Sequence, residues 1–289
     1  MHYEGMIIRP PSEADSIILQ VTVGCSHNKC TFCGTYKDVR FHLKQDDVVD
    51  QDIDFAATYC KRQKRVFLAD GDALIIPQRR LVDLLTRIRI KIPWVNRISL
   101  YGNAKSVLLK SAEELQELKS LGLDRVYMGL ESGADRILQN IRKGADAAKM
   151  IRAGQRVKEA GLFLSLTVLL GIGGTEFSRE HAVETGRVVS AMSANQIAVL
   201  TLMLLPNTGL YRLEKSGQFT LPNQMEMLHE LRLMVENISI SRAQFQANHA
   251  SNYLPINCRL SRDKEMVLAA IDQALNGEKR LTPEYLRAL

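Results

Sequence analysis

Short apolar runs alternate regularly with amphipathic stretches along this chain. Six runs are almost continuously apolar, as expected for strands that are buried on both faces. They cover residues 16–23, 65–70, 97–102, 125–131, 162–170 and 197–204. Helical patterns lie between them, at 48–61, 79–90, 112–121, 145–160 and 178–191. Six successive β-then-α units predict parallel strands joined by right-handed crossovers, in either an open sheet or a barrel.

The pattern changes after Pro206. A helix is expected over 224–238 and another over 263–275, whereas 247–260 reads as irregular and polar. We therefore predict two parts, a core over residues 1–211 and a C-terminal extension over 212–289 that packs on it. Within the core, Ser111 and Glu114 have the spacing of a helix capping box.

The composition is that of a globular protein, with 46% hydrophobic and 24% charged residues in a chain of 289. The N-terminal residues show no secretory signal, and no apolar run reaches the roughly 18 residues that span a bilayer. We expect a cytoplasmic protein with no membrane association. The net charge of +6 is compatible with a nucleic-acid partner but supports one only weakly, because the basic residues are scattered.

Three of the five cysteines lie within nine residues, as Cys25-x4-Cys30-x2-Cys33, where the first predicted strand ends. Ligands bind at this end of the strands in parallel α/β folds. Thiolates suit both iron–sulfur clusters and zinc, and the spacing alone leaves an iron–sulfur cluster, a zinc site or no metal open. Three cysteines would hold three irons of a [4Fe–4S] cluster and leave the fourth iron open to another ligand.

Further motifs follow the later strands in order. They are "FLADGDAL" (67–74), "VYMGLESGADRILQNIRKG" (126–144), "VLLGIGGTE" (168–176) and "LLPNTGLY" (204–211). Together with the cysteine loop, these segments resemble the radical S-adenosylmethionine (SAM) superfamily, in particular its oxygen-independent coproporphyrinogen oxidase-like and Elongator-type branch. The resemblance covers about residues 7–211. The chain departs from the family pattern in two places: the first cysteine gap has four residues where three are usual, and Asp70-Gly71-Asp72 replaces a double glycine.

The resemblance implies an α/β fold, an incomplete (β/α)6 TIM-like barrel with a short, mainly helical C-terminal extension. It also implies a single [4Fe–4S] cluster whose open iron binds SAM. An electron donor such as flavodoxin or ferredoxin would reduce the cluster, and SAM would be cleaved to methionine and a 5′-deoxyadenosyl radical. That radical would abstract hydrogen from a substrate. A small molecule is our first expectation for the substrate, and a tRNA or a protein is the second.

The resemblance also assigns roles to residues. Cys25, Cys30 and Cys33 would be the cluster ligands, and Phe32 would shield the cluster. The remaining SAM contacts would be Asp70, Gly71 or Asp72 for the ammonium, Asn103 and Glu131 for the ribose or amino group, Arg142 for the carboxylate, and Gly171 and Gly173 for adenine. Some of these residues have an ordinary alternative: turn capping for the aspartates, core packing for Phe32 and solvation for Arg142.

The substrate side is less constrained. His249, Asn252 and Tyr253 stand in the polar stretch after the core and are candidates for catalytic residues, with a purely structural loop as the alternative. Two rival functions stay open at this point, a zinc-binding module that is not an enzyme and a non-catalytic scaffold or cofactor chaperone.

Overall fold

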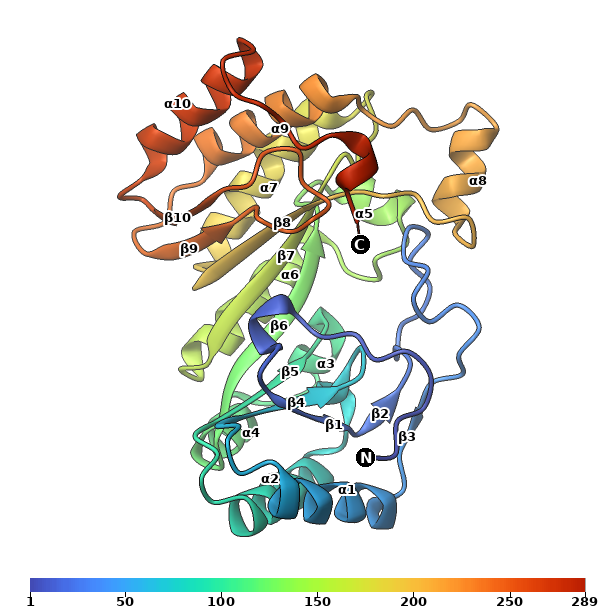
Figure 1. Cartoon of the computed structure of the whole chain (residues 1–289), viewed down its shortest axis with the longest axis vertical. Helices are drawn as coiled ribbons and strands as arrows, with labels where there is room; N and C mark the ends of the chain where they lie inside the picture. The colour runs from blue at the N-terminus through green and yellow to red at the C-terminus, as the bar shows by residue number, and fades with distance from the viewer. Residues whose placement is uncertain (289) are drawn as a thin grey trace. The chain divides into compact units, whose positions relative to one another are not determined.

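The structure is a computed structural model that describes residues 1–288, and strands and helices alternate along it (Figure 1). The chain divides into two compact units, which are described separately below. Unit 1 comprises Met1–Asn28, Thr35–Met128 and Arg156–Leu164. Unit 2 comprises Lys29–Gly34, Gly129–Gln155 and the chain from Ser165 onward. The boundary predicted at residue 211 stays a prediction.

Parallel strands form the centre of unit 1. Their order is β1 (Ile17–Gln20), β4 (Arg65–Ala69), β5 (Arg97–Tyr101) and β6 (Leu123–Glu131), of which the residues after Met128 belong to unit 2. Strand β2 (Thr22–Val23) instead pairs antiparallel with β3 (His42–Leu43). The first predicted strand is thus two strands that meet at Val21, whose N–H donates to the Ala69 carbonyl at 2.6 Å.

Helices cover this sheet. They are α1 (Asp46–Tyr59), α2 (Gln78–Lys91), α3 (Ala104–Leu108) and α4 (Ala112–Ser120), with short 3₁₀ turns η1 (Pro11–Glu13) and η2 (Ala73–Ile75). Helices α1 and α2 lie side by side (Figure 1). The predicted capping box begins α4: the Ser111 hydroxyl accepts from Glu114 N–H at 3.1 Å, and the Glu114 carboxylate accepts from Ser111 N–H at 2.7 Å.

Unit 2 has a second row of strands. Their order is β7 (Phe163–Leu170), β8 (Gln196–Thr201), β9 (Ala243–Gln246) and β10 (Asn257–Leu260). The first three are parallel, and β10 is antiparallel to β9. The expectation of irregular structure over 247–260 is therefore wrong at its end. In β10, Cys258 and Leu260 are buried while their neighbours are exposed, a period of two that a four-residue strand shows only weakly in sequence.

Helices account for most of the remaining chain in unit 2. They are α5 (Asp135–Asn140), α6 (Ala147–Glu159), α7 (Ser178–Met192), α8 (Gly209–Lys215), α9 (Gln224–Asn237) and α10 (Lys264–Leu275), followed by η3 (Glu284–Leu286). Helix α9 lies between α7 and α10 (Figure 1). Across residues 1–288, no helix is both long and apolar enough to cross a membrane.

The contact between α7 and α9 depends on Gly186. A Cβ at this position would lie 2.7 Å from the Asn237 Cβ and 2.9 Å from the Met234 carbonyl oxygen. Backbone atoms cannot move aside as a flexible side chain can, so α7 and α9 approach this closely only because residue 186 has no side chain. This packing joins α9, a helix after residue 211, to α7, a helix before it.

We predict that Gly186→Ala destabilises the protein, although alanine has the higher helix propensity by about 1 kcal/mol. The added methyl group overpacks the α7–α9 contact, which costs about 1–3 kcal/mol. Thermal unfolding should show a melting temperature lower by several degrees, with Glu180→Ala, an exposed position on the same helix, as the control. A raised melting temperature would contradict the close packing.

Candidate cofactor site

The turn after β4 lies against the start of the cysteine loop in unit 1. Gly71 N–H donates to the Gly24 carbonyl at 3.2 Å. A Cβ on Gly71 would meet the Cys25 Cβ at 3.2 Å and the Tyr36 ring at 2.9 Å. Glycine therefore lets the backbone of this turn run directly beside Cys25.

Asp72 connects this turn to the cysteine loop. Its Oδ2 accepts hydrogen bonds from the Ser26 hydroxyl and, at 2.7 Å, from the Asn103 amide. Its Oδ1 is buried, and no hydrogen bond to it is found within residues 1–288. Burial raises the pKa of Asp72, while hydrogen-bonding groups of Ser26, Ser106 and Asn103 oppose that rise. Within residues 1–288, Oδ1 is thus a buried acceptor that no donor reaches with good hydrogen-bond geometry.

Asp70 has a different environment. The Tyr36 hydroxyl donates to its Oδ1 at 2.5 Å and the Gln20 amide to its Oδ2 at 3.3 Å. Asp70 is also buried, which raises its pKa, and these hydrogen bonds act in the opposite direction. Both of its oxygens are bonded within the protein, so Asp72 is better suited than Asp70 to receive an outside ammonium group.

Asn103 uses its side chain inside the protein. Its Oδ1 accepts from Ser106 N–H at 2.9 Å and thereby caps α3, while its amide holds Asp72. The predicted contact of Asn103 with ribose stays a prediction.

The longer cysteine gap has a structural account in Asn28. This residue has φ 41°, in the left-handed region that asparagine tolerates better than most residues. Its amide donates to the Tyr36 carbonyl at 2.5 Å and more weakly to that of Val39 at 3.4 Å. Asn28 thus makes a local turn within the longer gap, and its side chain ties that turn to the chain after the cysteines.

The second part of the cysteine loop, Lys29–Gly34, belongs to unit 2. Thr31 N–H donates to the Ile141 carbonyl, and the Thr31 carbonyl accepts from Leu210 N–H, both at 2.9 Å. The Asn207 amide donates to the Gly34 carbonyl at 2.9 Å. Phe32 packs against an apolar cluster in the same unit that includes Ile141 and Leu210. The "LLPNTGLY" segment thus holds the loop that carries Cys30 and Cys33.

Glu131 ends β6 with φ 65°, a conformation that costs energy for a residue other than glycine. Its Oε1 lies 2.8 Å from the Lys143 ammonium, and both side chains are largely buried. Arg142, the residue expected to bind the SAM carboxylate, is exposed and also has a positive φ, of 54°. The sequence offers Arg142 and Lys143 side by side, and Arg142 was preferred because a guanidinium group can bind a carboxylate with two hydrogen bonds.

The glycine-rich segment after β7 forms a turn. Gly171 has φ 80°, and its carbonyl accepts from Gly174 N–H at 3.0 Å, with Gly173 inside the turn. Gly171 N–H donates to the Glu230 Oε1 at 2.6 Å. Glu230 was not expected from the sequence.

The three catalytic candidates lie in the β9–β10 connection. Asn252 is buried, and its amide donates to the Val199 carbonyl at 2.8 Å. The Tyr253 hydroxyl donates to the Glu284 carboxylate at 2.7 Å. His249 is half-buried, with Nδ1 3.0 Å from the Ser251 hydroxyl. Asn252 thus ties this connection to β8 and Tyr253 ties it to η3, and a catalytic role for the three residues stays a prediction.

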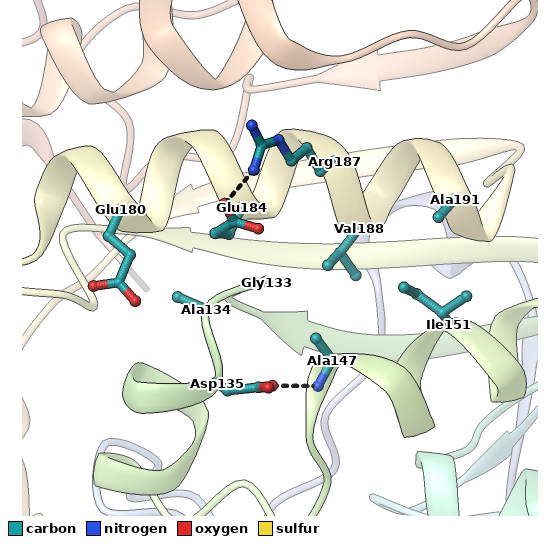
Figure 2. Close-up of a pocket in the computed structure, with 10 residues that line it drawn as sticks. All are labelled: Gly133, Ala134, Asp135, Ala147, Ile151, Glu180, Glu184, Arg187, Val188 and Ala191. Carbon is teal, nitrogen blue, oxygen red and sulfur yellow. Dashed lines mark hydrogen bonds and ion pairs between the residues drawn. The ribbon is translucent and has the colours of Figure 1, made fainter.

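A pocket of about 450 Å³ lies elsewhere in unit 2, beside α5, α6 and α7 (Figure 2). Its lining includes Ala134, Ile151 and Val188, and its rim carries the Glu184–Arg187 ion pair and the hydrogen bond from Ala147 N–H to Asp135. None of the predicted cofactor residues lines it. We therefore do not assign the cofactor to this pocket.

The donor set of the cysteine loop fits an iron–sulfur cluster. Cys25, Cys30 and Cys33 are half-buried and form no disulfide. Within residues 1–288, no three His, Cys, Asp or Glu side chains are grouped around one metal position. A [4Fe–4S] cluster does not require such a group, because each thiolate binds a different iron.

The family model of the radical SAM superfamily matches residues 19–186. Among curated proteins, the heme chaperone HemW of Bacillus subtilis (strain 168) is 24% identical over 166 residues, which cover 56% of this chain and 42% of HemW. HemW of Haemophilus influenzae is 26% identical over 246 residues, which cover 78% of this chain and 63% of that protein. The chain thus spans less than two thirds of the length of these relatives.

A solved structure with a similar fold is coproporphyrinogen III oxidase (HemN) from Escherichia coli, described as a radical SAM enzyme. The two are 13% identical, with a TM-score of 0.55 over 76% of this chain and 51% of HemN. This similarity confirms the predicted fold class, the α/β fold of a partial TIM-like barrel. The family match covers more than half of the chain and supports the expected branch through the HemW relatives. The chain belongs to the radical SAM superfamily, whose enzymes use a [4Fe–4S] cluster and SAM.

Proposed function

We propose that this chain is a radical SAM enzyme that holds one [4Fe–4S] cluster through Cys25, Cys30 and Cys33 and acts on a small-molecule substrate. The chemistry that a bound and reduced cluster would supply is one electron for the sulfonium of SAM, so that SAM would be cleaved to methionine and a 5′-deoxyadenosyl radical able to take hydrogen from the substrate. The protein's own residues bind and orient SAM and the substrate.

The observation that carries this proposal is the environment of Asp72. Its Oδ2 is tied to Ser26, the residue after Cys25, and its Oδ1 is a buried acceptor without a hydrogen-bond partner in the described chain. Buried carboxylate oxygens normally have a partner, and an unsatisfied one calls for an explanation. An ammonium group beside the first cluster ligand would supply that partner, and SAM carries one.

Unit 2 contributes its own part to the proposed site. Glu131 and Lys143 form a nearly buried ion pair at the end of β6, and a carboxylate in a strained backbone conformation is typical of functional sites. We assign Glu131 to the ribose or amino group, and Lys143, with or in place of Arg142, to the SAM carboxylate. Gly171 and Gly173 present backbone to adenine.

Fewer observations bear on the substrate than on the cofactor site. The net charge of +6 leaves modification of a tRNA or a protein as the alternative. A second candidate function, that of a cofactor chaperone, is favoured by the two HemW relatives, which are named as heme chaperones. Titration of the protein with haem, followed by the Soret absorbance, distinguishes a cofactor chaperone from the proposed enzyme. Saturable binding of one haem per chain would favour the chaperone.

We predict that Cys30→Ala prevents assembly of the cluster, because the remaining two thiolates hold too few irons. After anaerobic reconstitution, the wild-type protein should contain about four irons and four sulfides per chain, and the variant should contain few. Cys60→Ala, which removes a cysteine at the end of α1, is the matched control and should keep its iron. Full iron content in Cys30→Ala, or one zinc and no iron in the wild type, would contradict the assignment.

We also predict that Asp72→Asn weakens SAM binding about 10- to 100-fold while the iron content stays unchanged. The reason is the loss of a charge-assisted hydrogen bond, worth about 1.5–3 kcal/mol. Equilibrium binding to the unreduced, reconstituted protein measures the effect. Asp70→Asn is the matched variant: it should lower thermal stability through the Tyr36 and Gln20 contacts and change SAM affinity less. If Asp70→Asn weakened SAM binding and Asp72→Asn did not, Asp70 would be the residue that binds the ammonium group.

A further inference from the structure

A buried polar network lies behind the glycine turn of unit 2. Glu230 comes from α9 and is only 2% exposed. Its Oε1 accepts from Gly171 N–H at 2.6 Å, and its Oε2 accepts from the Ser178 hydroxyl at 2.5 Å. A side chain from a helix of the C-terminal extension therefore holds the first residue of the turn that follows β7.

His181 extends this network toward the end of β6. It is fully buried on α7, and its Nδ1 lies 2.9 Å from the hydroxyl of Ser132, the residue after Glu131. Its Nε2 lies 3.6 Å from the Glu230 Oε1. Thr185, one turn further along α7, accepts from Gly133 N–H at 2.8 Å. Side chains of α7 thus hydrogen-bond to the turn after β6, and a side chain of α9 accepts from the turn after β7.

The charges in this network are constrained by burial. Burial raises the pKa of Glu230 to about 7 and lowers that of His181 to about 4. Both neighbours of Glu230 donate hydrogen bonds to it, which favours its ionised form, and His181 is neutral near pH 7.

Glu230 occupies a position that helical periodicity assigns to the core. Its neighbours on the same face of α9 are Met227, Leu231 and Met234, all buried. An apolar side chain of similar volume would suit this position at least as well for stability, since a buried charge must be compensated by hydrogen bonds. Packing therefore does not explain a carboxylate at this position, whereas its hydrogen bond from Gly171 N–H does.

We propose that Glu230 is a positioning residue for SAM: it fixes the backbone of the glycine turn at Gly171 and so presets the surface that receives adenine. This inference rests on the proposed function, because it takes the turn as the adenine site. Glu230 itself does not touch the cofactor in this account. Its effect passes through one backbone N–H.

The test uses the reconstituted, unreduced protein under anaerobic conditions, with S-adenosylhomocysteine as the probe. Glu230→Leu removes the acceptor, Glu230→Gln keeps one, and Glu236→Leu alters an exposed glutamate on the same helix as a control. Two quantities are measured, the Kd of the probe and the hydrogen exchange of the amides in residues 169–177. Glu230→Leu should raise the Kd about 10-fold or more and speed exchange at Gly171 by a similar factor. For Glu230→Gln, the Kd and the exchange rate at Gly171 should stay within about 3-fold of the wild-type values. For Glu236→Leu, both should equal the wild-type values.

A folded Glu230→Leu protein with wild-type affinity and wild-type exchange at Gly171 would overturn the proposal. So would a loss of affinity with unchanged exchange, because the effect would then not pass through the turn. If Glu230→Leu does not fold, Ser178→Ala replaces it: removal of one of the two donors should loosen the carboxylate and speed Gly171 exchange about 3-fold. Absence of probe binding in the wild type would instead contradict the proposed function, while the exchange data would still decide whether Glu230 holds the turn.

Discussion

The hydrogen bond from Gly71 N–H to the Gly24 carbonyl is the contact on which the arrangement in unit 1 depends. It joins the turn after β4 to the chain just before Cys25, and no side chain larger than glycine's fits between them. With that turn in place, Asp72 reaches both Ser26 and Asn103. The carboxyl ends of parallel strands gather at one edge of a sheet, and here the start of the cysteine loop, the turn after β4 and Asn103 after β5 meet at Asp72.

In unit 2, a hydrogen bond from a backbone N–H also fixes a glycine turn, but a side chain accepts it. There the backbone N–H at the start of a glycine turn, Gly171, is held by a carboxylate from a helix, Glu230. In both units, a turn that follows a strand is fixed before any ligand arrives. Preorganised backbone at the strand ends lowers the entropic cost of binding, because less of the protein has to be ordered when the ligand binds. The two units differ in what supplies the anchor, a neighbouring main-chain carbonyl or a buried side chain.

Much of the fold could be predicted because its signals are local. All six apolar runs contain strands, and the capping box at Ser111 and Glu114 forms as expected. Two-residue strands such as β3 give no periodicity to detect, and β9 and β10 are too short to show one clearly. The short helix α3 was missed because it directly follows Asn103, which was interpreted only as a ligand contact, whereas the helix expected before Arg142 is confirmed as α5.

The candidate site was predictable at the level of motifs and less so at the level of atoms. Asp70 and Asp72 are equivalent in the sequence, and only their tertiary hydrogen bonds distinguish them: Tyr36 and Gln20 donate to Asp70, while Ser26 and Asn103 donate to Asp72. Glu230 lies about sixty residues after the turn it holds, yet a carboxylate on the apolar face of α9 was a signal that periodicity could have supplied. These partners depend on tertiary contacts, which no local pattern contains.

The most direct test of the central claim is whether the reconstituted protein cleaves SAM when it is reduced. The protein is incubated anaerobically with dithionite and SAM, and 5′-deoxyadenosine is quantified by chromatography. Our account predicts that 5′-deoxyadenosine forms in an amount that depends on both the cluster and SAM. A protein that carries about four irons and binds SAM, yet forms no 5′-deoxyadenosine on reduction, would contradict it and leave a non-catalytic scaffold as the better description.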